Sequence, residues 1–197
     1  MDRSQYWNDR YAAGSLWGAG PNPRIAGLVA PLRRGKALDL GAGSGRHAVW
    51  MATLGHTVTA VDISDVGIEQ GRRLAADVGV DVNWVVADVT GWQPDTGYDL
   101  VLCAYLQLPA DDRRAAHTVA VRALAPGGTL LVLAHHLDNL ERGVGGPQHP
   151  DVLFTEADLR LDFAALDIAT CKPVLRTVAG EGDAIDLLCV ATRPGDV

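Results

Sequence analysis

Short apolar runs alternate with longer segments of mixed polarity over the first two thirds of the chain. Continuous apolar runs of this length are typical of parallel strands that helices cover on both faces. Strands that alternate with helical segments indicate βαβ units. We therefore expect an α/β fold with a Rossmann-like, doubly wound sheet. The five strands predicted here are Ala37–Leu40, Val58–Val61, Val82–Ala87, Leu100–Ala104 and Thr129–Ala134.

The helices between these strands carry recognisable start and stop signals. One helix is expected over Gly45–Leu54, and the next over Asp65–Val78 with Ser64 as its N-cap. A third is expected over Asp111–Leu124, because the Ala-Pro-Gly-Gly sequence that follows ends a helix sharply.

The last third of the chain has a different pattern. Residues Leu137–Val152 are rich in glycine and proline and are predicted to form a long loop. The sequence Thr155-Glu-Ala-Asp158 resembles a capping box that opens a helix to about Phe163. Leu166–Val178 and Ile185–Thr192 then form two strands around a glycine-rich turn, which predicts an antiparallel hairpin.

The first 34 residues do not fit a strand. Trp7, Tyr11 and Trp17 lie in a polar segment that contains glycine and proline. Such a segment either folds over the top of the sheet as a lid or packs on the core only as a helical arm. We expect one domain over residues 1–197, with an arm over 1–34 and a Rossmann-like core over 35–197.

Composition narrows the class of protein. The 197 residues suffice for one domain, and 48% hydrophobic with 21% charged residues is ordinary for a globular protein. No apolar run reaches the length of a membrane span, and the polar N-terminus does not resemble a signal peptide. We therefore expect a cytoplasmic protein with no membrane partner, a monomer or a weak homodimer.

The charge disfavours a nucleic-acid partner. The net charge is −7, whereas a nucleic-acid binder usually shows a basic face. The pairs Arg72–Arg73 and Arg113–Arg114 lie in helical segments and are expected on solvated faces. The three cysteines (Cys103, Cys171 and Cys189) lack metal or disulfide spacing, so buried thiols and no metal are expected.

A glycine loop follows the first strand. Asp39 lies near the end of that strand, and Gly41, Gly43 and Gly45 follow it. Glycine allows a sharp turn into the next helix and a close approach by a ligand, and the helix presents its N-terminal amides to that ligand. The loop alone is weak evidence for a nucleotide.

Carboxylates at the next two strand ends make the interpretation specific. Asp62 ends the second strand, where it suits both ribose hydroxyls, and Asp88 follows the third, where it suits an adenine amino group beside Val89. Asp39 would repel a pyrophosphate but suits the cationic end of an amino acid. The G-x-G-x-G spacing also differs from the G-x-G-x-x-G of dinucleotide sites.

These motifs resemble those of class I S-adenosylmethionine-dependent methyltransferases. They are Asp39-Leu-Gly-Ala-Gly-Ser-Gly45, Val61-Asp62, Ala87-Asp88 and Leu124-Ala-Pro-Gly-Gly-Thr-Leu-Leu131, in order along nearly the whole chain. The resemblance implies S-adenosylmethionine as cofactor and strand order 3-2-1-4-5-7-6 with strand 7 antiparallel, in agreement with the hairpin. The residues expected to bind the cofactor are Asp39, Gly41, Ala42, Gly43, Gly45, Arg46, Asp62, Ile63, Asp88, Val89, Ala104 and Trp17.

A narrower resemblance is to the tellurite-resistance (TehB-like) methyltransferases, with thiopurine methyltransferases more distant. It rests on short motifs and implies a small acceptor with a soft or phenolic nucleophile. Those motifs are Trp7-x-x-Arg-Tyr11, Trp17-Gly-x-Gly-Pro-Asn22, Ala48-Val-Trp50, Tyr105-Leu-x-Leu108 and Gly143-x-Gly-Gly-Pro147.

The expected reaction is methyl transfer to a small molecule with a sulfur, selenium, tellurium, oxygen or nitrogen nucleophile. It needs the reacting atoms held in line, and a base only for an acceptor that carries a proton of high pKa. Tyr105 after the fourth strand, His135 after the fifth and Arg142 on the glycine- and proline-rich segment 137–152 are the candidate catalytic residues. His135 and His136 are equally explained as ordinary strand-end histidines, pointing to opposite faces.

Two other classes of function compete with this one. A non-catalytic protein that binds or senses S-adenosylmethionine would carry the same motifs. A nicotinamide-dependent oxidoreductase would need the dinucleotide loop spacing and a nicotinamide half-domain, and both are missing from the sequence.

Overall fold

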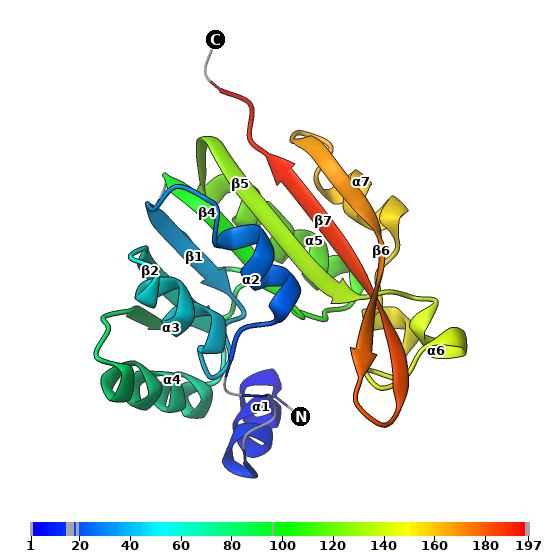
Figure 1. Ribbon diagram of the computed structural model, residues 1–197, viewed down its shortest axis with the longest axis horizontal. Helices are drawn as coiled ribbons and strands as arrows, with labels where there is room; N and C mark the ends of the chain where they lie inside the picture. The colour runs from blue at the N-terminus through cyan, green and yellow to red at the C-terminus, as the bar shows by residue number, and fades with distance from the viewer. Residues whose placement is uncertain (1, 15–17, 19, 96, 196–197) are drawn as a thin grey trace.

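The computed structural model describes residues 2–14, 18, 20–95 and 97–195, and its centre is one seven-stranded sheet (Figure 1). The strand order is β3-β2-β1-β4-β5-β7-β6, and β7 runs antiparallel to both of its neighbours. The predicted fold and strand order are confirmed. The strands are β1 (Lys36–Leu40), β2 (Thr57–Asp62), β3 (Asn83–Val86), β4 (Tyr98–Ala104), β5 (Leu124–His135), β6 (Asp167–Val178) and β7 (Gly182–Thr192).

The helices follow the predicted signals closely. Ser64 caps its helix by accepting from the amide of Gly67, and Thr155 and Asp158 form both bonds of a capping box. The helices are α1 (Arg3–Ala12), α2 (Pro23–Val29), α3 (Arg46–Thr53), α4 (Asp65–Val78), α5 (Ala110–Ala123), α6 (Asn139–Arg142), the 3₁₀ turn η1 (Pro150–Val152) and α7 (Glu156–Asp162).

Three predicted boundaries need correction. The long loop expected over residues 137–152 contains α6 and η1. Strand β5 begins at Leu124, directly after α5, and not at Thr129, because the Ala-Pro-Gly-Gly sequence is part of the strand. Strand β7 begins at Gly182 and not at Ile185, because the long ribbon with β6 pairs up to Val178 and Gly182.

Two hydrophobic layers cover the sheet. One face packs against α2 and α3 through residues such as Ile25 and Met51, and the other packs against α5 and α7 through residues such as Val119 and Leu159. Figure 1 shows α2 and α3 in front of the sheet and α5 and α7 behind it. The two layers leave the carboxyl ends of the parallel strands as the edge where a ligand can bind.

The segment before the sheet is helical. Helix α1 packs against α4, and α2 covers the sheet, so the described residues of this segment, 2–14, 18 and 20–34, contain no strand, as expected. Figure 1 shows α1 below the sheet, at the end toward which β1 points. Within the described residues, no helix combines the length and apolarity that crossing a bilayer requires.

One expectation about surface charge is wrong. Arg113, expected on a solvated face, is 4% exposed and pairs with Asp162 and Asp158 of α7. The helical position alone did not show that α7 would cover this face of α5. The three cysteines are buried, as predicted.

Candidate functional site

A pocket lies at the carboxyl ends of the parallel strands, under α1. Its walls come from α1, from the glycine loop between β1 and α3, and from the segments that follow β2, β3 and β4. The lining residues are Arg3, Trp7, Tyr11, Gly41, Ala42, Gly43, Ser44, Arg46, His47, Asp62, Ile63, Asp88, Val89, Ala104, Tyr105, Leu106, Gln107 and Leu108.

The glycine loop is shaped by close neighbours. Gly43 has φ 56°, and a Cβ there would lie 2.2 Å from the hydroxyl of Tyr11 on α1. Gly45 has φ 76°, and a Cβ there would lie 2.3 Å from the ring of Trp84. Both positions therefore require glycine, for the left-handed backbone and for the close approach.

Asp39 is a buried carboxylate without a cation bonded to it. It is 1% exposed, and neither side-chain oxygen has a well-formed hydrogen bond within the described residues. Burial, with the nearby charge of Asp62, raises the pKa of Asp39 to about 7. A buried carboxylate of this kind is stabilised by a cationic or hydrogen-bond-donating ligand.

Asp62 fixes the loop from the neighbouring strand. Its Oδ2 accepts from the amide of Gly43 at 2.7 Å, and its Oδ1 accepts from the amide of Ser64 at 2.9 Å. Burial raises its pKa, while these backbone bonds act in the opposite direction. Each carboxylate oxygen still has a lone pair available for a hydroxyl donor from a ligand in the pocket.

Asp88 meets the N-terminal helix. Arg3 of α1 donates to its Oδ2 at 2.5 Å and to Asp112 of α5 at 2.9 Å. Burial alone would raise the pKa of Asp88, but hydrogen bonds from Thr90 and the charge of Arg3 lower it overall. Arg3 thus joins α1 to the pocket rim.

Further bonds hold α1 over the loop. The hydroxyl of Ser4 donates to the carbonyl of Ile63 at 3.2 Å, and that of Ser64 bonds to Asn8 at 2.7 Å. The side chain of Gln70 donates to the carbonyl of Tyr11 at 2.8 Å. The arm therefore covers the cofactor side of the pocket in this conformation.

The other wall of the pocket centres on Tyr105. It has φ 56°, the only positive value among the described residues other than glycine. Its hydroxyl donates to Oδ2 of Asp186 at 2.7 Å and accepts from Asn22 at 3.0 Å. Burial, together with the charge of Asp186, raises the pKa of Tyr105 above its usual range, so the phenol stays protonated.

His135 and Arg176 lie behind this wall, where both contact Asp186, and do not themselves line the pocket. Nδ1 of His135 lies 3.3 Å from Oδ1 of Asp186, and Nε of Arg176 donates to Oδ2 of Asp186 at 2.7 Å. Burial would raise the pKa of Asp186, but its contacts with His135, Arg176 and Tyr105 lower it. The ring of His135 lies 5.0 Å from that of Tyr105, between centroids.

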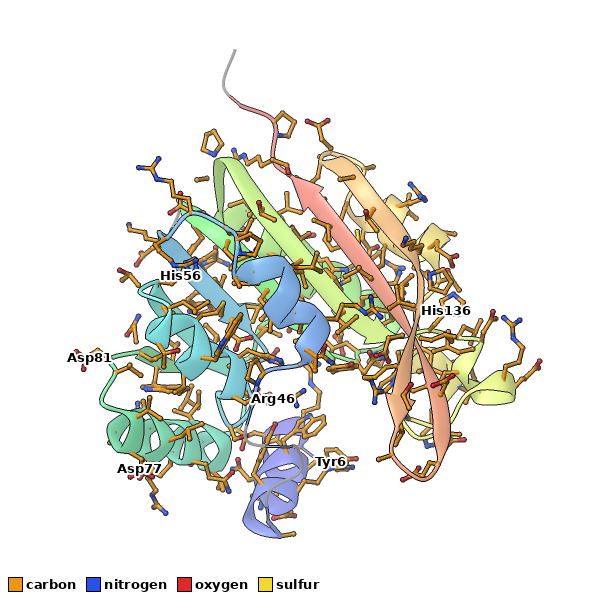
Figure 2. All side chains as sticks on the ribbon, in the orientation of Figure 1. Tyr6, Arg46, His56, Asp77, Asp81 and His136 are labelled. Atoms are coloured by element: carbon orange, nitrogen blue, oxygen red, sulfur yellow. The ribbon has the colours of Figure 1, made fainter. Side chains whose placement is uncertain are left out.

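Arg46 and His47 begin α3 at the pocket. Figure 2 shows Arg46 at that end of α3, close to α1. Burial, with the charge of Arg46, lowers the pKa of His47 to about 3, so its Nε2 accepts from the amide of Asn22 at 3.2 Å. These contacts connect the N-terminal segment to both walls of the pocket.

The structure brings most of the predicted cofactor residues together. Asp39 near the end of β1 and Gly45 of the loop do not line the pocket, and Trp17 lies outside the described residues. The nine predicted residues that line the pocket are Gly41, Ala42, Gly43, Arg46, Asp62, Ile63, Asp88, Val89 and Ala104.

The three predicted catalytic residues are not equally placed. Tyr105 lines the pocket, whereas His135 does not line it but packs on the ring of Tyr105. Arg142 lies on α6 with 66% of its side chain exposed and pairs with Asp138, and it does not line the pocket. Strand β5 ends at His135, and His136 contacts Glu156 and the amide of Asp138, so its partners differ from those of His135.

Sequence reasoning missed Arg3, Arg176 and Asp186. One signal was available for Asp186, which is the only charged residue in the apolar run 184–191. A charge at the centre of a buried strand needs partners from elsewhere in the fold. Arg3 and Arg176 carried no comparable signal, because isolated arginines are ordinary surface residues.

The sheet order, the glycine loop and the strand-end carboxylates define a class I, Rossmann-like methyltransferase. A family described as "Methyltransferase domain" matches residues 37–128. A 2-heptyl-1-hydroxyquinolin-4(1H)-one methyltransferase of Mycobacteroides abscessus is 30% identical over 161 residues, which cover 77% of this chain and 68% of that protein. The chain belongs to the S-adenosylmethionine-dependent methyltransferases.

Other relatives agree with this assignment over shorter spans. A 27-O-demethylrifamycin SV methyltransferase of Amycolatopsis mediterranei is 35% identical over 130 residues, 64% of this chain and 47% of that protein. This chain therefore spans less than half of that relative.

Solved structures show the same fold. N-methyltransferase NodS from Bradyrhizobium japonicum, in complex with S-adenosylhomocysteine, has a TM-score of 0.77 at 19% identity and covers 98% of this chain and 100% of its own. TehB from Haemophilus influenzae has a TM-score of 0.70 at 16% identity, with 98% and 68% covered.

S-adenosylmethionine is the cofactor of this family, and the residues in the pocket fit it. The buried carboxylate of Asp39, which lacks a bonded cation, suits an ammonium group. Gly43 and Gly45 leave room where a Cβ would meet Tyr11 or Trp84.

Proposed function

We propose that this protein transfers the methyl group of S-adenosylmethionine to a small-molecule acceptor by in-line displacement. The observation that carries the proposal is Asp39, a buried carboxylate behind a glycine loop whose amide at Gly43 is held by Asp62. A carboxylate without a bonded cation and a fixed hydrogen-bond acceptor beside it suit a ligand that carries an ammonium and a ribose.

We assign roles to the residues along the pocket. Asp39 meets the ammonium of the methionyl part, and Asp62 accepts from the ribose hydroxyls. Asp88 lies at the adenine end, beside the apolar side chain of Val89. Arg3 donates to Asp88, so this carboxylate is shared between the arm and the ligand.

The bound cofactor supplies an activated methyl group. The chain then has to orient the acceptor in line with the methyl group and exclude water. Residues 104–108, which follow β4 and line the pocket, provide the surface between the two ligands. We propose that α1, bonded over the loop through Arg3 and Ser4, is a lid that opens for exchange of the cofactor.

The acceptor is proposed to be a small molecule with a phenolic, N-hydroxyl or soft nucleophile. Support comes from the name of the relative in Mycobacteroides abscessus, a methyltransferase for an N-hydroxyquinolone. The motifs shared with the TehB-like group, from Trp7 to Gly143–Pro147, favour placement in that subgroup, with thiopurine methyltransferases more distant. A protein that only binds S-adenosylmethionine is the competing function.

Calorimetry with S-adenosylhomocysteine tests the cofactor assignment. Asp62→Ala is expected to remove most of the affinity, because the variant loses the ribose acceptor and the bond to Gly43. Asp99→Ala is the matched control, because Asp99 accepts from the amide of Lys36 at the opposite end of β1. An unchanged dissociation constant in Asp62→Ala would contradict the ribose assignment.

Transfer of a labelled methyl group separates an enzyme from a binding protein. The wild-type protein is incubated with labelled S-adenosylmethionine and a panel of phenols, N-hydroxyquinolones, thiols, chalcogen oxyanions and amines. Label in one acceptor class supports the proposed function and names the nucleophile. Tight binding of S-adenosylhomocysteine with no labelled product in any class would favour the binding protein.

A further inference from the structure

Four side chains from distant parts of the chain form a second polar group beside the pocket. We call Tyr105, His135, Arg176 and Asp186 the Asp186 cluster, because Asp186 contacts the other three. They come from the segment after β4 and from β5, β6 and β7. The cofactor assignments proposed above use none of them.

We propose, building on the methyl-transfer function proposed above, that Asp186 is a positioning residue for His135. It holds His135 as the group that takes a proton from the acceptor, and it thereby favours acceptors with an ionisable O–H or S–H group. The argument rests on the hydrogen-bond roles in the cluster, on exposure and on the placement of Tyr105.

The contacts of Asp186 point to one tautomer of His135. Oδ2 of Asp186 accepts from Tyr105 and from Nε of Arg176, at 2.7 Å each, and Oδ1 accepts from Nη2 of Arg176 at 3.3 Å. Oδ1 also faces Nδ1 of His135 at 3.3 Å, without a well-formed hydrogen bond. An ionised carboxylate can only accept, so this contact becomes a hydrogen bond only when Nδ1 carries the proton. The lone pair of the neutral imidazole then lies on Nε2.

Exposure points the same way. Nδ1 of His135 is fully buried, although the residue as a whole keeps 7% of its surface exposed. The exposed part therefore lies elsewhere on the residue. Gly146 also packs on the ring, since a Cβ there would lie 2.9 Å from Nδ1. The side of His135 that faces Asp186 and Gly146 is closed to the acceptor.

The charges around His135 leave it as the proton acceptor. Arg176 on β6 neutralises Asp186 on β7 and lowers the pKa of that carboxyl, so Asp186 stays ionised. Tyr105 stays protonated because burial raises its pKa. Arg46 on α3, close enough to interact with Tyr105 and Arg176, adds a positive charge at the same wall. Histidine is the side chain that most often acts as a general base in enzymes.

Tyr105 connects this cluster to the pocket. Its ring lies 5.0 Å from that of His135, and it lines the pocket together with Gln107, whose Oε1 accepts from the amide of His135 at 2.9 Å. The left-handed backbone of Tyr105 is sustained by the bonds of its hydroxyl to Asp186 and Asn22. Strain retained in this way at a pocket wall is typical of functional sites.

The proposed step balances without a further reactant. The acceptor gives its O–H or S–H proton to Nε2 of His135. Its oxygen or sulfur bonds to the methyl carbon, and the electron pair of the broken carbon–sulfur bond stays on sulfur, which leaves S-adenosylhomocysteine. The imidazolium of His135, stabilised by Asp186, later loses its proton to water.

The chain offers a matched control for Asp186. Asp162 is equally buried and contacts His117 at 2.7 Å and Arg113 at 2.7 Å, but under α5 and away from the pocket. Asp162→Asn therefore reports what the loss of one buried carboxylate charge does to the fold. Any effect on catalysis beyond that control belongs to the Asp186 cluster.

The decisive measurement is the tautomer of His135, read by ¹⁵N NMR on the labelled protein with S-adenosylhomocysteine and assigned with His135→Gln. We expect the proton on Nδ1 in the wild type and in Asp162→Asn, and its transfer to Nε2 in Asp186→Asn. A wild-type proton on Nε2, or an Asp186→Asn spectrum identical to the wild type, would overturn the proposal. This result does not depend on any acceptor.

Kinetics with two acceptor probes give the second measurement. On 4-methylphenol at pH 7, His135→Gln is expected to lower kcat about 10²-fold and Asp186→Asn about 10-fold or more, with KM for the cofactor unchanged. On 4-nitrothiophenol, which is already ionised at this pH, both variants should stay within about threefold of the wild type. Equal losses on both probes would show a structural role only and overturn the proposal.

The two proposals fail in distinguishable ways. If the wild type does not bind S-adenosylhomocysteine in calorimetry, the cofactor assignment of the pocket fails, whatever the tautomer of His135. If it binds and His135 carries its proton on Nε2, the cofactor assignment stands and the role of Asp186 is wrong.

Discussion

Two groups in this protein each contain a histidine, a buried aspartate and an arginine. One group is enclosed between two helices, and the other lies beside the pocket. Asp162 binds His117 and Arg113 between α5 and α7, and Asp186 binds His135 and Arg176 beside the pocket. The Asp162 group is closed, because Arg113 is only 5% exposed in its side chain and the His117 ring packs on Phe163 at 4.6 Å.

The Asp186 group contains the same three residue types, but its His–Asp contact is longer and its arginine is more exposed. Its His–Asp contact is 3.3 Å instead of 2.7 Å, and Arg176 keeps 32% of its side chain exposed. The comparison teaches that residue types alone do not separate a structural group from a functional one, whereas geometry and access do.

The largest expected effect is the loss of folding stability when Asp162 of the enclosed group is replaced. Asp162→Ala removes the nearer carboxylate partner of the buried Arg113 and the only carboxylate that His117 contacts among the described residues, and leaves Arg113 with Asp158 at 3.1 Å. The free energy of unfolding should therefore fall by about 3 kcal/mol, the lower end of the range for breaking a buried ion pair. Urea unfolding followed by circular dichroism measures it. Affinity for S-adenosylhomocysteine, measured below the unfolding transition, should not change. A loss of less than about 1 kcal/mol would contradict the description of the Asp162–Arg113 pair as a buried ion pair.

Asp39 is a third buried carboxyl group, and its pKa is shifted in the opposite direction. The pKa of Asp39 is raised, whereas the pKa values of Asp162 and Asp186 are lowered. The folded pKa of Asp39, about 7, lies above its unfolded value, so folding takes up a proton. Its contribution to stability is present at low pH and is lost as pH rises through about 7. Asp39→Asn should therefore stabilise the ligand-free protein at pH 8 by about 1–3 kcal/mol while weakening S-adenosylhomocysteine binding.

Thermal unfolding from pH 5 to 8 checks this sign. The ligand-free wild type should lose stability over that range relative to Asp39→Asn, and S-adenosylhomocysteine should bind the wild type more tightly as pH rises, because its ammonium requires the ionised carboxyl. Parallel pH profiles for the two proteins would show that Asp39 is not a strained, buried carboxylate.

A smaller loss of folding stability is expected when Asp186 is replaced. Asp186→Ala frees Arg176 and Tyr105, but the guanidinium is partly exposed and reaches water, so the free energy of unfolding should fall by about 1–2 kcal/mol. The loss should be clearly below that of Asp162→Ala in the same urea titration. Equal losses would remove the distinction between the two groups.

The smallest effect is expected at Arg142. It is exposed on α6 and pairs only with Asp138, four residues earlier in the chain. Arg142→Ala should change stability by less than about 0.5 kcal/mol, because exposed pairs contribute little. Binding of S-adenosylhomocysteine and methyl transfer should stay at wild-type levels. A large loss of transfer with intact binding would return Arg142 to the list of catalytic candidates.

Much of the fold was predictable because its signals are local. Ser64 and Thr155 cap their helices through bonds within three residues, and the apolar runs of the parallel strands report burial on both faces. The glycine loop, Asp62 and Asp88 follow successive strands, so parallel topology alone brings them to one edge. The cofactor class followed from these features.

The wrong prediction for Arg113 shows that local sequence does not determine the burial of a helical residue. A helical arginine is ordinary on a solvated face, and only the packing of α7 on α5 turns it into a buried ion pair. The β-ribbon of β6 and β7 was likewise predicted as a hairpin. The position of Arg176 and Asp186 behind Tyr105 of the pocket wall depends on the pairing of β7 with β5, far away in the sequence.

The sequence by itself determined the sheet, its order through the family resemblance, and the methyl donor, because periodicity, caps and strand-end carboxylates act over short spans of chain. Only the tertiary structure decided which side chains meet at and behind the pocket wall. Tyr105, His135 and Asp186 come together from separate parts of the chain, and Arg3 reaches Asp88 across 85 residues of sequence. Contacts of that kind depend on how the elements pack, which no local pattern encodes.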